Sequence, residues 1–105
     1  TEIQKDELPW YYLTYNEDTT VLYSNKYKNV IGNIEFYVPT SSIITINIRN
    51  SNNEVMSTLI KETSVGPGNH KFSLNVSVSL WQKGEYIVYV YEDYSKVISK
   101  KTFEL

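Results

Sequence analysis

The side chains that most often do chemistry in proteins are few and scattered in this sequence. Its single histidine, His70, follows the loop 66–69, and no nucleophile with an orienting partner accompanies it. There are no cysteines, which excludes disulfides, thiol nucleophiles and thiolate metal sites together. A zinc site would need further histidine or cysteine ligands. We therefore expect no catalytic residue, no bound metal and no cofactor.

Two acidic pairs, Glu17–Asp18 and Glu92–Asp93, each follow a tyrosine within two residues. If both lay in turns at one end of a β-sandwich, their carboxylates and nearby carbonyls could hold a calcium ion. No calcium-loop motif accompanies either pair, so we interpret them as solvated turns. Glycoside hydrolysis needs two carboxylates at a defined separation in a cleft. A small sandwich seldom encloses such a cleft, and the sequence favours a protein that is not an enzyme.

The aromatic residues are more informative, and the segment GEYIVYVYEDYSK (84–96) holds four tyrosines. Tyr89 and Tyr91 alternate with Val88 and Val90, so in a strand they share the face opposite the valines. With Tyr94 in the turn that follows, these rings form a candidate contact surface, because tyrosine is favoured at interfaces. The alternative is that they are packing residues covered by another part of the chain.

A second aromatic cluster, PWYYLTY (9–15), supplies Trp10 and Tyr12 on one face of an extended strand. Such rings suit a platform on which sugar rings stack, and we count both residues as candidate binding residues. They equally suit a first strand that packs onto the core. In that case the segment could lie across Tyr89 and Tyr91 and bury them.

The elements that must position these residues follow a period of two, which is typical of half-buried strands. Ile44, Ile46 and Ile48 alternate with polar residues, and asparagine, proline and glycine turns separate the runs. The pattern predicts one core formed by Phe36, Ile44, Ile46, Ile48, Phe72, Leu74, Val88 and Val90. Strands are expected near Trp10–Tyr15, Thr19–Ser24, Val30–Val38, Ile43–Arg49, Glu54–Thr63, His70–Val76, Gly84–Glu92 and Lys96–Leu105. The predicted fold is an all-β antiparallel sandwich of about seven or eight strands.

Composition sets the remaining bounds. The 105 residues predict a single domain, 1–105, and the net charge of −2 with scattered lysines argues against nucleic acid as a partner. No apolar run approaches the roughly 20 residues of a membrane span, so we expect no membrane insertion. No signal peptide is visible, which leaves a mature exported protein, an excised domain and a cytosolic chain as alternatives.

The spacing Gly84-x-Tyr86-x-Val88 resembles strand F of immunoglobulin-like domains. In that family a tyrosine near the start of the strand bonds through its hydroxyl to backbone a few residues upstream, here near Leu80 or Trp81. The expected strand Ile43–Arg49, which would correspond to strand C of that family, lacks the core tryptophan of antibody domains, which argues against that branch. The stretch 43–105 resembles bacterial immunoglobulin-like accessory domains, including those of flagellar hook-capping proteins and the sandwich tails of secreted proteins.

This resemblance implies a structural or adhesive function. We therefore expect a non-catalytic binding, adhesion or accessory module of an exported or surface-assembled bacterial or phage protein. It would act outside the cell or at the cell surface and contact another protein or a polysaccharide. The alternative is a small stand-alone inhibitor or chaperone-like binder that acts through its loops. An enzyme would need a cleft with clustered histidine and carboxylate groups, and the sequence offers one histidine.

Overall fold

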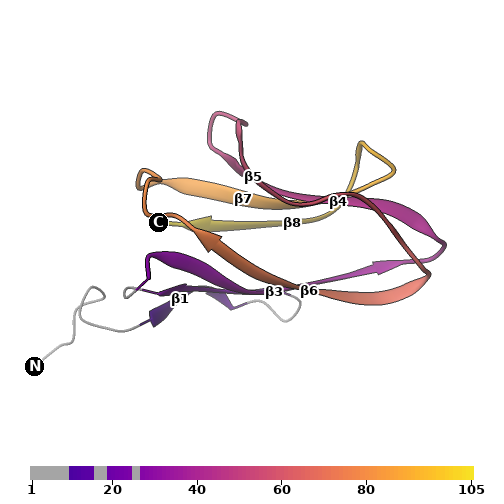
Figure 1. Ribbon diagram of the computed structural model, residues 1–105, viewed down its shortest axis with the longest axis horizontal. Helices are drawn as coiled ribbons and strands as arrows, with labels where there is room; N and C mark the ends of the chain where they lie inside the picture. The colour runs from indigo at the N-terminus through magenta and orange to yellow at the C-terminus, as the bar shows by residue number, and fades with distance from the viewer. Residues whose placement is uncertain (1–9, 16–18, 25–26) are drawn as a thin grey trace, which may run out of the picture.

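The computed structural model describes residues 10–15, 19–24 and 27–105, with the backbone alone described for 10–15 and 19–20. Within these residues all the regular structure is β-strand (Figure 1). The strands are β1 (Trp10–Tyr15), β2 (Thr19–Ser24), β3 (Asn29–Val38), β4 (Ser42–Asn50), β5 (Val55–Val65), β6 (Gly68–Ser77), β7 (Glu85–Glu92) and β8 (Lys96–Glu104).

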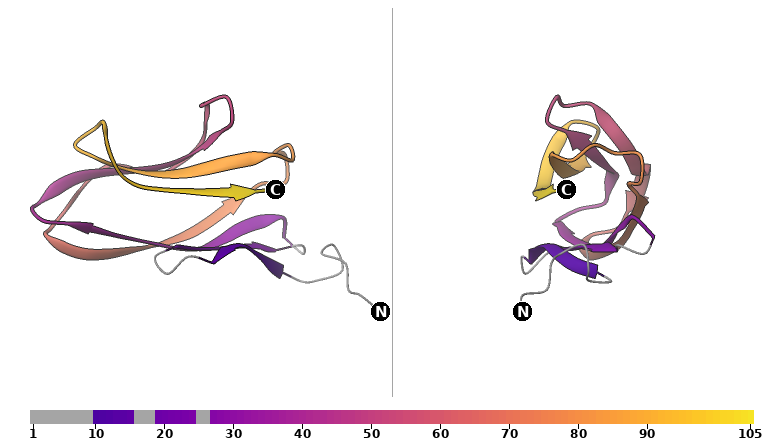
Figure 2. Two further views of the ribbon diagram at one scale, coloured as in Figure 1. Left: turned by 180° about the vertical axis from the view of Figure 1, so that it is seen from behind. Right: turned by 90° about the vertical axis from the view of Figure 1, so that its left-hand side faces the viewer.

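The strands form two four-stranded antiparallel sheets that pack face to face. Sheet A has the order β1-β2-β3-β6, and sheet B has the order β5-β4-β7-β8. The chain therefore changes layer between β3 and β4, between β5 and β6, and between β6 and β7 (Figure 1). At one side of the molecule β1 approaches β8, whereas β5 and β6 lie on the opposite side (Figure 2). The predicted all-β sandwich is confirmed.

Local residue chemistry explains where the strands begin and end. β3 ends at Val38 because Pro39 has no amide hydrogen to donate to the ladder. β6 begins at Gly68, whose φ of +117° is a conformation that residues with a side chain rarely adopt. The β4–β5 pairing shifts register at three points, and Glu62 of β5 has a left-handed φ of 44°. β5 is therefore an irregular edge strand.

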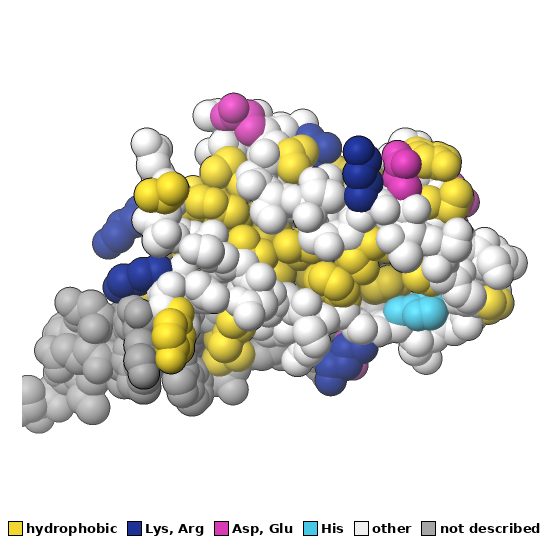
Figure 3. All heavy atoms as spheres, viewed as in Figure 1, with side chains coloured by type: hydrophobic (Ala, Val, Ile, Leu, Met, Phe, Trp, Pro, Cys, Tyr) yellow, Lys and Arg dark blue, Asp and Glu magenta, His cyan; other side chains and the backbone are white. Residues whose placement is uncertain are grey.

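The core lies between the sheets and consists of the inward side chains of alternating residues. The buried hydrophobic side chains are Val21, Val30, Ile34, Phe36, Val38, Ile44, Ile46, Ile48, Leu74, Val76, Val78, Tyr86, Val88, Val90 and Phe103. The predicted core is confirmed except that Phe72 is only half-buried: it packs against the margin of the core, whereas Leu74 and Val76 of the same strand are buried. Figure 3 shows hydrophobic side chains gathered in a band between the two sheets on the side that faces the viewer.

Tyr86 makes the backbone contact that the sequence predicts. Its hydroxyl donates to the carbonyl oxygen of Gln82 at 2.6 Å, so the acceptor is Gln82 and not Leu80 or Trp81. Its ring packs between those of Trp81 and Phe103, with centroid distances of 5.1 and 5.8 Å. Tyr86 thus fixes the segment that leads into β7, and its predicted structural role is confirmed.

Two hairpins rise from sheet B, away from sheet A (Figures 1 and 2). In the β4–β5 hairpin, the Asn50 side-chain oxygen accepts hydrogen bonds from the backbone amides of Asn52 and Glu54, at 3.0 and 2.9 Å. In the β7–β8 hairpin, Asp93 and Tyr94 both have positive φ, at 51° and 77°. These hairpins stand at opposite ends of the outer face of sheet B.

Candidate functional site

Tyr89 and Tyr91 lie on the outer face of sheet B, opposite the buried Val88 and Val90, as the alternation predicts. Both tyrosines are half-buried. Their rings stack with centroids 5.5 Å apart and planes inclined by 23°. A stacked pair of this kind is a stabilising arrangement of aromatic side chains. The two rings therefore form one unit on the outer face of the sandwich.

Two cations lie against these rings. The guanidinium carbon of Arg49 is 6.0 Å from the centroid of Tyr89 and 5.8 Å from that of Tyr91. The ammonium nitrogen of Lys100 is 5.9 Å from the Tyr89 centroid. At these distances a cation is attracted by the electrons of the ring face. We call the surface formed by Arg49, Tyr89, Tyr91 and Lys100 the tyrosine face.

Arg49 also ties the tyrosine face to the neighbouring hairpin. Its terminal nitrogen donates to the backbone carbonyl of Asn53 at 3.0 Å and to the Asn53 side-chain oxygen at 3.4 Å. Asn53 is itself held in the left-handed conformation, with φ of 63°. The position of the hairpin and the position of the guanidinium over the rings are therefore coupled.

A buried asparagine lies beneath this layer of side chains. Asn47 pairs with Tyr89 across the β4–β7 ladder, faces outward and is only 6% exposed. Among the described residues, its side-chain oxygen and the Nε of Arg49 are buried without a hydrogen-bond partner. Buried polar atoms without partners lower stability. The outer face of sheet B is thus a packed layer in which these two buried polar atoms lower the stability of the fold.

The sequence analysis missed Arg49, Lys100 and Asn47. The strand register is the feature that would have revealed them, because it places Tyr89 between Asn47 of β4 and Lys100 of β8. This register depends on which strands are neighbours, and alternation within one strand does not reveal it.

The other predicted binding residues lie apart from the stacked pair or outside the described side chains. Tyr94 is 64% exposed in the β7–β8 hairpin. Trp10 and Tyr12 belong to β1, which pairs with β2 in sheet A, and their side chains lie outside the described part of the structure. Because Trp10–Tyr15 lies in the other sheet, the alternative that this segment covers Tyr89 and Tyr91 is wrong.

His70 has a local structural role. Its ring stacks on Phe36 at 5.5 Å, and its Nε2–H donates to the carbonyl oxygen of Gly66 at 2.6 Å. The histidine thus closes the loop between β5 and β6. The contacts of its ring are the Phe36 ring and a backbone carbonyl, so neither contact pairs the histidine with a nucleophilic side chain.

The acidic pairs show no metal site in the part of the chain that the structure describes. Asp93 is used locally, because its side-chain oxygen accepts a hydrogen bond from the backbone amide of Ile43 at 3.3 Å. No group of three or more histidine, cysteine, aspartate or glutamate side chains comes together among the described residues. Glu17–Asp18 lies outside them. The described residues also contain no helix that could cross a membrane.

Comparison with protein-family models, with curated proteins and with solved structures found no match to this chain.

Proposed function

We propose that the chain is a non-catalytic binding module that contacts a partner protein through the tyrosine face. The observation that carries the proposal is the stacked pair of Tyr89 and Tyr91, with the guanidinium of Arg49 over both rings, on the outside of the sandwich. Tyrosine and arginine are among the residues that contribute most to binding energy at protein interfaces. Their side chains combine a large apolar area with groups that form hydrogen bonds.

The geometry favours a protein over a polysaccharide as the partner. A sugar ring stacks on an open aromatic face, and here the two rings face each other at 5.5 Å. Arg49 and Lys100 lie close to the same rings. These two cations give the surface a positive charge, which complements an acidic segment on the partner. The preferred partner is therefore a protein segment with apolar and acidic side chains.

The immunoglobulin-like resemblance belongs to the same proposal. It is supported by the tyrosine corner at Tyr86, by the pairing of β3 with β6 in sheet A and by the pairing of β4 with β7 in sheet B. Domains of this kind serve as accessory or adhesive modules of exported and surface-assembled bacterial and phage proteins. We accordingly propose that the module acts outside the cell or at the cell surface.

A second candidate function is a small inhibitor or chaperone-like binder that acts through its loops. It is favoured by Tyr94, a residue that is 64% exposed in the β7–β8 hairpin. A loop binder of this type would use Tyr94 and the hairpin and would not need the stacked pair.

The experiment is selection of a random peptide library displayed on phage against the folded domain. The selected peptides are then measured against three variants: Tyr89→Ser with Tyr91→Ser, Tyr94→Ser, and Tyr37→Ser. The last is a matched control, since Tyr37 is 60% exposed on the outer face of sheet A. We expect acidic peptides with apolar residues, and a loss of affinity of at least about tenfold in the double variant alone.

Two outcomes would redirect the proposal. A loss confined to Tyr94→Ser would transfer the function to the hairpin and support the loop binder. If no peptide is enriched, a glycan array probed with the parent and the double variant decides whether the same face binds a polysaccharide. Equal binding of the peptides to all three variants would overturn the tyrosine face as the contact surface.

A further inference from the structure

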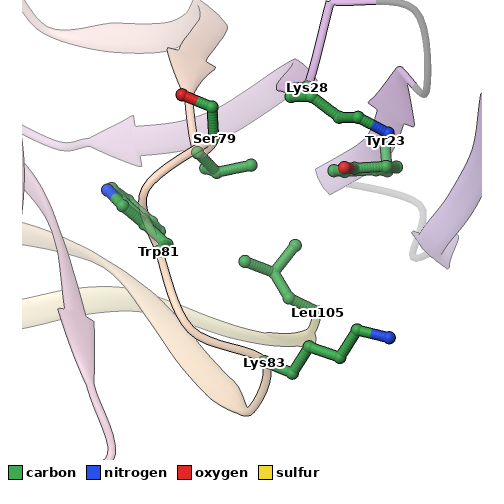
Figure 4. A pocket seen from close by; sticks show the side chains of 7 residues that line it. Tyr23, Lys28, Ser79, Trp81, Lys83 and Leu105 are labelled. Carbon is green, nitrogen blue, oxygen red and sulfur yellow. The ribbon is translucent and has the colours of Figure 1, made fainter.

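A pocket of about 270 Å³ opens at one end of the sandwich, at a site distinct from the tyrosine face. Three separate parts of the chain line it: β2 with the β2–β3 turn, the segment between β6 and β7, and the end of β8 (Figure 4). Its volume lies just below the roughly 300–1,000 Å³ of most small-molecule pockets. It therefore suits a ligand about the size of one substituted ring.

The interior of the pocket is apolar and partly aromatic. Tyr23, Val78, Trp81 and Leu105 contribute its walls. Figure 4 shows the Trp81 ring on one side, the Tyr23 ring on the other and the Leu105 side chain between them. Burial of an apolar ligand against these side chains would remove apolar area from water, which is the main source of affinity in such pockets.

Two lysines give the pocket its charge. Lys28 and Lys83 enter from opposite sides, and their ammonium groups extend toward the same side of the pocket (Figure 4). The ammonium nitrogen of Lys28 also lies 6.0 Å from the centroid of the Tyr23 ring. Among the described residues that line the pocket, none has an acidic side chain. An apolar cavity with two cations at one side is complementary to a ligand with an apolar body and an anionic group.

Hydrogen bonds hold the three parts of the pocket together before any ligand binds. The amide of Val78 donates to the carbonyl of Lys28 at 2.9 Å, and Gly84 and Leu105 exchange two backbone hydrogen bonds at 2.9 and 3.2 Å. The Tyr86–Gln82 hydrogen bond and the packing of Tyr86 on Trp81 fix the wall between them. A preorganised pocket loses less conformational entropy on binding.

We propose that this pocket binds a small organic anion, namely a carboxylate on an aromatic or short aliphatic body. The apolar walls contact the body, and the ammonium groups of Lys28 and Lys83 bind the carboxylate through charge-assisted hydrogen bonds. The proposal does not depend on the tyrosine face, which lies on the outer surface of sheet B.

The test uses three probes of one shape that differ in charge: phenylacetate, phenylacetamide and phenethylamine. Each is titrated into the full chain, and the amide resonances of Ser79, Trp81 and Lys83 are followed by heteronuclear NMR. We expect saturable shifts with phenylacetate at a Kd near or below about 1 mM. Phenylacetamide should bind about tenfold more weakly, and phenethylamine should give no saturable shift.

Matched variants separate pocket charge from overall charge. Lys28→Gln with Lys83→Gln should weaken phenylacetate about tenfold and leave phenylacetamide unchanged. Lys61→Gln with Lys71→Gln removes the same two charges from exposed positions outside this pocket and should change neither affinity. Preserved dispersion of the amide resonances confirms that both variants are folded.

An affinity for phenylacetate that is unchanged by Lys28→Gln with Lys83→Gln would refute the proposal. Equal affinity for phenylacetate and phenethylamine, or equal weakening by both double variants, would refute the assignment of the anion to Lys28 and Lys83. Absence of saturable shifts with all three probes up to about ten times the expected Kd would show that the pocket is only a surface depression.

Discussion

Replacing Tyr86 with phenylalanine tests the hydrogen bond that fixes the segment between β6 and β7, which also forms one wall of the pocket. The change removes one hydroxyl and leaves the ring between Trp81 and Phe103. It therefore creates almost no cavity, and the hydrogen bond to the carbonyl of Gln82 is what is lost. A bond of this kind contributes roughly 0.5–1.5 kcal/mol, and leaving a partly buried carbonyl without its donor adds to that loss. The expected decrease in the free energy of unfolding is about 1–2 kcal/mol.

Urea unfolding followed by circular dichroism measures this decrease. For a domain of this size 1 kcal/mol corresponds to about 4–8 °C in Tm, so a thermal scan should show a shift of roughly 5–15 °C. Tyr37→Phe is the matched control, because it removes a tyrosine hydroxyl from a side chain that is 60% exposed. That control should change stability by less than about 0.5 kcal/mol. Coincident unfolding curves for Tyr86→Phe and the parent would refute the structural role of the hydroxyl. Equal shifts in both variants would refute it as well.

Three further outcomes are expected. Tyr89→Ser combined with Tyr91→Ser should lower the free energy of unfolding by about 2–3 kcal/mol in urea titrations, because both rings are half-buried and stacked. A loss above about 5 kcal/mol would mean that the pair is part of a closed core. Glu62→Gly should raise stability by up to about 1 kcal/mol, since a left-handed φ of 44° is unfavourable for glutamate, and Glu62→Ala should bring no such gain. Millimolar calcium should change the Tm by less than about 1 °C relative to the calcium-free protein. A rise of several degrees would point to a calcium site at the acidic turns.

The features that could be predicted from the sequence are those that depend on near neighbours along the chain. Ile44, Ile46 and Ile48 are fully buried, and Val88 and Val90 are buried on the neighbouring strand of the same sheet, because successive side chains of a strand point to opposite sides. The strand ends follow from proline and from residues that tolerate left-handed backbone, which are also local properties. Phe72 shows the limit of this reasoning, because alternation gives the side to which its ring points but not how completely distant parts of the chain cover it.

The candidate site could be predicted only in part. The common face of Tyr89 and Tyr91 follows from their spacing, and the exposure of Tyr94 follows from its place in a turn. The cations over the rings cannot be predicted from this spacing, because Arg49 and Lys100 lie on β4 and β8, whereas Tyr89 lies on β7. Their contact requires β4 and β8 on either side of β7 in one register.

Sequence alone therefore determined the strands, their inward and outward faces and the tyrosine that anchors the start of β7. Tertiary structure decided which strands became neighbours, and with that the stacked and charged character of the tyrosine face. It also placed Trp10–Tyr15 in sheet A and brought Tyr23, Trp81 and Leu105 together around one pocket. The physical reason is that side-chain alternation is a property of the backbone of each strand. Strand order instead depends on the total free energy of many contacts between distant residues, which no short segment encodes.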